Sequence, residues 1–143
     1  MAEISFNDVF DAVTLALHNA FPDAHIWGED MDQGVSPGDF NVLPITANHT
    51  FRLGSRAERT STFDVIYYPS TSGGRVECLT RAQIMPYVLE HVTTAAGDHL
   101  HCSSFSHNIT DDVLHCIVSY NHFVLSTTEK DEMRALVIKE VSE

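Results

Sequence analysis

Near the start of the chain, apolar residues recur at three- and four-residue steps, a spacing that gathers them on one side of a helix. These residues are Phe6, Val9, Phe10, Val13, Leu17 and Phe21. Ser5 is suited to cap the first turn, Asp8 places an acid near the positive end of the helix dipole, and Pro22 stops the pattern. The spacing predicts an amphipathic helix within residues 5–22.

A second helical pattern follows the glycine pair Gly73–Gly74. Apolar positions there step by four and three residues, at Cys78, Ala82, Met85, Leu89, Val92 and Ala96. Pro86 lies inside the pattern, and an interior proline costs a helix about 3 kcal/mol. The sequence therefore leaves open whether this is one helix or two short segments that meet at Met85–Pro86.

Apolar and polar residues alternate elsewhere, which predicts strands. In residues 111–125 one face carries Leu114, Cys116, Val118, Tyr120, His122 and Val124. Residues 98–107 form a preceding strand across the turn sequence 108–112, and Phe63, Val65 and Tyr67 share a face of a third strand. Shorter strand signals lie around Ile26–Trp27 and in residues 40–45, where Pro44 favours a sheet edge or a strand end.

Two segments lack a clear pattern. Residues 47–59 are polar and contain Gly54, so they are expected to be a long loop or the tip of a hairpin. Residues 126–143 form a C-terminal extension with charges at helical spacing, although the cluster Leu136–Val137–Ile138 favours a strand. The 143 residues contain no repeat, so we expect a single domain, 1–143, of α+β class: a mainly antiparallel sheet packed against two helices.

Charge and composition narrow the classes of function. The chain has 20 acidic residues against 8 lysines and arginines, a net charge of −12, which disfavours binding to nucleic acid or to an anionic membrane. The first residues lack the pattern of a secretory signal, and no apolar run approaches the ~20 residues of a membrane span. Three irregularly spaced cysteines are typical of reduced thiols. No cofactor motif is present.

Nine histidines raise the question of a metal site. His99 and His101 would share a face of a strand, and a neighbouring strand would have to supply further ligands, for which His115 or Cys116 are candidates. The chain has no CxxC or HExxH motif, so the preferred interpretation is a half-exposed sheet with polar residues on its wet face. No metal site is predicted, and His99 and His101 are the candidates should one exist.

The sequence offers no catalytic residues. His115 and Cys116 are adjacent and would point to opposite faces of a strand, so they cannot form a nucleophile–base pair. Cys116 and His122 share a face but lie ~20 Å apart along it. A separate cluster of Arg52, Arg56 and Arg59 is either a partner-facing patch or a solvated loop whose arginines pair with acids such as Glu58.

Taken together, a series of short motifs resembles the tail terminator proteins of long-tailed bacteriophages, of the type found in phages and prophages of Gram-positive bacteria. The first half of the series is Phe21–Pro22, Ile26–Trp27–Gly28–Glu29, Gln33–Gly34, Phe40, Leu53–Gly54, Arg56 and Arg59. The second half is Phe63–Asp64–Val65, Tyr67–Tyr68–Pro69, Asp112, Leu114–His115, Val118 and Tyr120. Gly73–Gly74, Pro86 and residues 98–110 depart from the family pattern.

The resemblance implies a structural virion protein and not an enzyme. Such proteins form a homomeric ring, commonly a hexamer, that caps the head-proximal end of the tail tube, ends tube polymerisation and provides the head–tail joining surface. The implied partners are copies of the chain itself, the tail tube protein and a head-completion or connector protein. Genomic DNA would pass through the lumen without specific binding.

The implied location is the tail or neck of the virion, after assembly in the host cytoplasm. Residues 47–59, with Arg52, Arg56 and Arg59, would correspond to the family's hairpin loop and make subunit or tube contacts. Two alternatives stay open at this point. One is another neck or head–tail adaptor ring protein, and the other is a zinc-binding enzyme or sensor that uses His99, His101 and a sheet neighbour.

Overall fold

The first helix forms where the apolar spacing predicts it. In the computed structural model, which describes residues 4–28, 36–70 and 74–125, α1 spans Phe6–Ala20. Ser5 caps it in a reciprocal pair: the Asp8 N–H donates to Ser5 Oγ at 3.1 Å, and the Ser5 N–H donates to Asp8 Oδ2 at 2.8 Å. The buried face carries Val9, Ala12, Val13 and Leu17. The predicted helix and its cap are confirmed.

The second helix is a single element. α2 spans Gly74–Leu89 and runs through Pro86, which lies in its last turn. Its buried residues are Cys78, Ala82, Met85 and Leu89. The prediction that the pattern continues to Val92 and Ala96 is wrong, because Val92 lies in β4 (His91–Thr93) and Ala96 in the turn that follows it.

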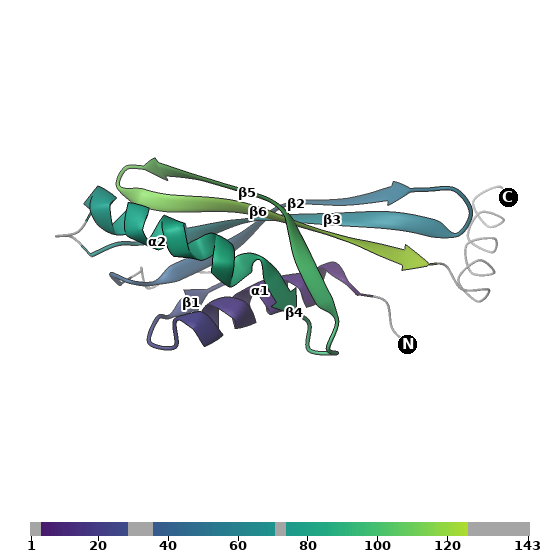
Figure 1. Cartoon of the computed structure of the whole chain (residues 1–143), viewed down its shortest axis with the longest axis horizontal. Helices are drawn as coiled ribbons and strands as arrows, with labels where there is room; N and C mark the ends of the chain where they lie inside the picture. The colour runs from purple at the N-terminus through teal and green to yellow at the C-terminus, as the bar shows by residue number, and fades with distance from the viewer. Residues whose placement is uncertain (1–3, 29–35, 71–73, 126–143) are drawn as a thin grey trace, which may run out of the picture.

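Six strands form one curled sheet in the order β1-β2-β3-β6-β5-β4, with both helices on the same side of it (Figure 1). The other strands are β1 (Ile26–Trp27), β2 (Phe40–Phe51), β3 (Arg56–Tyr67), β5 (His99–Thr110) and β6 (Val113–Leu125). Every pairing is antiparallel except β1 with β2. The predicted α+β class, a mainly antiparallel sheet packed against two helices, is confirmed.

Residues 47–59, expected to be a long loop or the tip of a hairpin, form the tip of the β2–β3 hairpin, and most of them are strand. β2 continues to Phe51 and β3 starts at Arg56, so residues 47–51 and 56–59 are paired and only residues 52–55 form the turn. Pro44 lies beyond the two residues of β2 that pair with β1, next to a register shift between Pro44 and Thr46. A proline is tolerated there because its missing N–H faces no neighbouring strand.

β6 alternates as its sequence predicts. Leu114, Cys116, Val118 and Tyr120 are fully buried, and His122 lies on the same face with its Nε2 at 3.1 Å from the carbonyl oxygen of Ile4. The four fully buried side chains pack with those of α1, α2 and the inner faces of β2 and β3 in one core. The C-terminal extension, 126–143, and its predicted strand lie outside the described residues.

Candidate functional site: assembly surfaces

The sheet has two long open edges in the described part of the chain. β1 covers β2 only at Phe40 and Asn41, so residues 42–51 are open on that side. β4 covers β5 only at residues 99–101, so residues 103–110 are open as well. Neither stretch contains an aspartate, glutamate, lysine or arginine. Proteins commonly protect an exposed strand edge with charged residues, so two uncharged edges indicate strands available for pairing.

The outer face of α2 forms a second surface. Val76, Leu79, Ile84 and Tyr87 are 74%, 50%, 42% and 79% exposed. Thr80 and Gln83 occupy the outward positions between them, and the exposed Arg75 lies beside this face in the first turn of the helix. Since the opposite face packs into the core, α2 is apolar on both sides. Helices that are apolar on both sides are usually covered by protein on both sides.

A third surface lies where β2, β3 and β6 end together, at the right of Figure 1. We call it the hairpin end. It consists of Phe51, Leu53, Phe123 and Leu125, which are 72%, 96%, 51% and 64% exposed. Neither of the two described helices covers it (Figure 1).

The three predicted arginines lie beside the hairpin end but do not form one patch. Arg52 forms an ion pair with Glu58, as the alternative interpretation of the sequence expected, and Arg56 lies over the Phe123 ring at 4.2 Å. Arg59 points to the other face of β3, where its Nη1 donates to the Ile4 carbonyl oxygen at 3.1 Å. Arg59 therefore holds the start of the chain against the sheet, and Arg52 and Arg56 stay at the exposed end.

A partly buried hydrogen-bond network fixes α2 on the sheet and so positions its outer face. Glu77 accepts hydrogen bonds from the Ser70 hydroxyl at 2.6 Å, from the Ser70 N–H at 3.0 Å and from the Tyr67 hydroxyl at 2.6 Å. These bonds, those from Ser70 first, lower the pKa of the Glu77 carboxyl. The Arg81 guanidinium lies over the rings of Phe21 and Tyr67, at 4.6 and 4.9 Å. Phe21 and Tyr67 both belong to the motif series.

Two further members of the motif series meet on the opposite face of the sheet. His115 Nδ1 lies 3.0 Å from Asp64 Oδ2, across the β3–β6 pairing. Both side chains are partly covered, at 26% and 18% exposure. This contact is not predictable from the sequence, because it depends on the register between two strands that are far apart in the chain.

The structure places the candidate metal ligands differently from the expectation. His99 and His101 share an exposed face of β5, as predicted. The strand opposite them is β4, whereas His115 and Cys116 pair with Asn108 and His107 near the other end of β5. His115 and Cys116, the candidates for further ligands, therefore do not lie beside His99 and His101, and that candidate ligand set is wrong. Burial raises the pKa of the Cys116 thiol to about 12, which keeps it protonated and unreactive.

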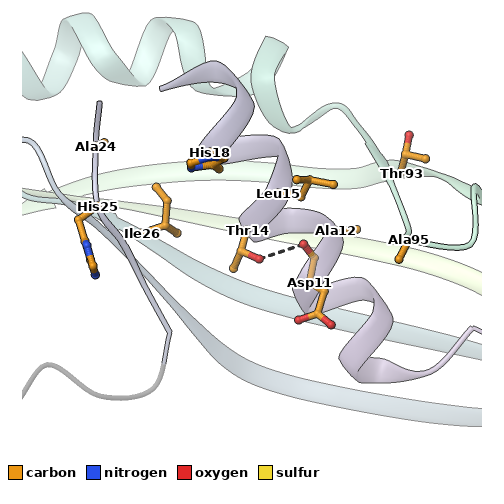
Figure 2. A pocket seen from close by; sticks show the side chains of 10 residues that line it. All are labelled: Asp11, Ala12, Thr14, Leu15, His18, Ala24, His25, Ile26, Thr93 and Ala95. Atoms are coloured by element: carbon orange, nitrogen blue, oxygen red, sulfur yellow. Dashed lines mark hydrogen bonds between the residues drawn. The ribbon is translucent and has the colours of Figure 1, made fainter. Parts of the chain in front are cut away.

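A surface depression of about 610 Å³ lies between α1, β1 and the turn after β4. Figure 2 shows that its polar side chains do not converge: Thr14 donates to the Asp11 carbonyl oxygen at 2.9 Å within α1, and His25 points away from the helix. The His25 ring instead packs on Trp27, with 4.3 Å between the ring centroids. The side chains that line this depression therefore offer no paired acid and base.

Comparison with known proteins decides the family. A sequence model of a family described as phage tail terminator protein matches residues 8–132. The chain belongs to this phage tail terminator family. A tail terminator is a structural component of the phage tail, so the chain is a virion tail protein that associates with other tail and head components.

Other comparisons add little to this assignment. No curated protein matches the terminator. One solved structure, whose name states no function, is 12% identical, with a TM-score of 0.45, and the match covers 87% of the terminator and 98% of that chain. In the residues that the structure describes, neither helix of the terminator is long and apolar enough to cross a membrane.

Proposed function

We propose that the terminator assembles as a homomeric ring, most simply a hexamer, on the head-proximal end of the tail tube. The ring ends tube polymerisation and provides the surface to which a head-completion or connector protein attaches. Two open, uncharged strand edges at opposite sides of the sheet are the observation that carries the ring. Membership of the tail terminator family supports the proposed position of the ring on the tail tube.

The strand directions suit extension of the sheet from copy to copy. β2, β3, β6 and β5 alternate in direction, so β5 runs opposite to β2. If β2 of the next copy, in the same orientation, lies against the open edge of β5, the new pair is antiparallel like its neighbours. Such an interface joins two different surfaces, head to tail, and a head-to-tail interface closes into a ring when its rotation permits.

The two apolar surfaces are proposed as further contacts. We assign the outer face of α2 to the neighbouring subunit, because α2 contacts β5 and a strand added at the open edge of β5 brings the next copy close to the helix. The hairpin end projects beyond both described helices, so it is placed to reach a subunit or the tube, with Arg52 and Arg56 as its cations.

The net charge of −12 supports passage of DNA without binding. Acidic walls repel phosphate and release no counterions from it, so genomic DNA would pass through the ring unhindered. No catalytic role is proposed for this chain. Assembly in the host cytoplasm and a Gram-positive host stay predictions from the sequence resemblance.

The edge contact can be tested at His107. Asp111 and Asp112 have φ angles of 53° and 60° and form a two-residue hairpin loop of type I′, closed by the pair Thr110 and Val113. Backbone groups alternate along an antiparallel strand, so we infer that His107 directs its N–H to the open edge and not to β6. His107→Pro removes that N–H and leaves the β5–β6 ladder intact, whereas His107→Ala keeps it.

We expect the untagged wild type and His107→Ala to form rings on purified tail tubes in negative-stain images and to stop tube growth. His107→Pro should do neither while keeping the circular dichroism spectrum and unfolding temperature of a folded protein. Rings formed equally well by His107→Pro would refute the edge contact. A wild type that stays monomeric at every concentration and never binds tubes would refute the terminator ring itself. Gold labelling that places the chain only on the head side of the connector would indicate an adaptor instead.

A further inference from the structure

Three side chains with metal-ligating atoms meet where α2 ends and β4 begins. Glu90 directly follows α2, His91 opens β4, and His101 lies opposite His91 on β5. Glu90 Oε1 lies 3.8 Å from His91 Nε2 and 3.7 Å from His101 Nε2. The ligand atoms of the three residues all lie within 4.8 Å of one another.

We propose that Glu90, His91 and His101 form a binding site for a divalent transition metal ion of the zinc or nickel class. Zinc binds imidazole nitrogen and carboxylate oxygen at about 2.0–2.2 Å, so two ligands of a tetrahedral ion are about 3.4 Å apart. The two contacts with Glu90 are only a few tenths of an ångström longer than this spacing. A small rotation of exposed side chains closes the difference, and water supplies the remaining ligand.

The backbone holds the three positions in place. His91 and His101 are direct partners across the β4–β5 ladder, and the Cys102 N–H donates to the Glu90 carbonyl oxygen at 2.8 Å. The next pair in the ladder, Val92 and Leu100, is buried at 2% and 4% exposure and fixes the hairpin on the core. A metal ion therefore finds ligands whose Cα positions are already set, which lowers the entropic cost of binding.

The chemistry of the ligands also selects the ion. Two imidazoles favour zinc, nickel, cobalt and copper, whereas magnesium and calcium prefer sites made of oxygen alone. His99, on the same face of β5, is not within reach of these ligand atoms, and its Nδ1 lies 3.0 Å from Thr93 Oγ1. Bound metal would join the end of α2, β4 and β5, and so would stiffen the short hairpin at this edge of the sheet.

Calorimetry on the untagged full chain tests the site, with zinc chloride and then nickel chloride as the titrant. We expect one ion per chain, at least tenfold weaker binding for His101→Ala and for Glu90→Gln, and no detectable binding of magnesium chloride. His107→Ala serves as a control, because it removes an exposed histidine elsewhere on β5, and it should bind zinc like the wild type. Cys102→Ser should also bind like the wild type, because Cys102 lies on the other face of the strand.

A second measurement separates loss of the site from loss of the fold. Zinc should raise the unfolding temperature of the wild type and of His107→Ala but not that of His101→Ala, whose unfolding temperature without metal should equal that of the wild type. The proposal would be overturned by equal weakening in His101→Ala and His107→Ala, by magnesium binding as strong as zinc binding, or by no saturable binding of either zinc or nickel. None of these outcomes bears on ring assembly, which is tested at the edge of β5.

Discussion

The hydroxyl of Tyr120 joins the centre of the sheet to the last residue of α2. Tyr120 is fully buried on β6, and its hydroxyl donates to the Leu89 carbonyl oxygen at 2.6 Å. Burial raises the pKa of Tyr120, so its hydroxyl keeps its proton and stays a donor at neutral pH. Leu89 is also fully buried, so water does not readily replace this donor.

Tyr120→Phe removes the hydroxyl and keeps the ring, so the cavity left behind is small. The main loss is the hydrogen bond, together with a carbonyl oxygen left without this donor, which costs about 1–3 kcal/mol. We expect a loss of about 2 kcal/mol in the free energy of unfolding. For a domain of this size 1 kcal/mol shifts the melting temperature by about 3–4 °C, so the shift should be about 7 °C.

Urea denaturation followed by circular dichroism measures this loss, with all proteins at one concentration because assembly also stabilises the fold. Tyr87→Phe is the matched control, since Tyr87 is 79% exposed on the outer face of α2 and its change should stay within about 0.5 kcal/mol. The reasoning is refuted if Tyr120→Phe is as stable as Tyr87→Phe, because Leu89 would then have another donor available.

Three further changes test separate parts of the fold by urea denaturation. Ser5→Ala breaks the reciprocal cap of α1 and should cost about 1 kcal/mol, and an unchanged midpoint would contradict the cap. Glu77→Ala removes three hydrogen bonds and should cost about 2 kcal/mol at pH 7. Because those bonds lower the pKa of Glu77, the wild type loses their contribution as pH falls below about 4.5, and the two proteins should converge there; a constant difference would contradict this. Burial lowers the pKa of His122 below its usual value of 6.5, so protonation favours the unfolded state. The free energy of unfolding of the wild type should therefore fall by up to about 1.4 kcal/mol per pH unit as pH falls below 6.5. His122→Gln should lack this component, and equal slopes in the two proteins would count against it.

An element can be predicted from the sequence when the contacts that determine it are between residues close together in the chain. α1 is predictable with its cap and its buried face, because Ser5, Asp8 and the apolar positions all act within a few residues. The two faces of β6 are predictable for the same reason, since its alternation alone places Tyr120 and His122 on one face, which the structure shows to be the buried one. The tail terminator family is also readable from the sequence, because its motif series runs along most of the chain.

Long-range contacts decide the rest. Val92 lies three residues after Leu89 and continues the helical period, yet the helix ends where Tyr120 and Cys102 donate to the carbonyl oxygens of Leu89 and Glu90. The pairing of β4 with β5 places His91 directly opposite His101. His91 lies outside the group of histidines at residues 99–122, so the sequence pattern does not indicate this contact. Strand register across a turn depends on the packing of both strands and is not visible in either sequence alone.

The outer face of α2 shows why the assembly must rest on more than one surface. Its four exposed apolar side chains are about half to four-fifths exposed, so their full burial would contribute about 4–8 kcal/mol in total. Association of two proteins costs about 4–15 kcal/mol in lost freedom of motion. The α2 face alone therefore gives a marginal net stabilisation at most, and the strand edges must supply most of the stability of the ring. For this reason we expect His107→Pro to abolish the ring although it leaves every residue of the α2 face in place.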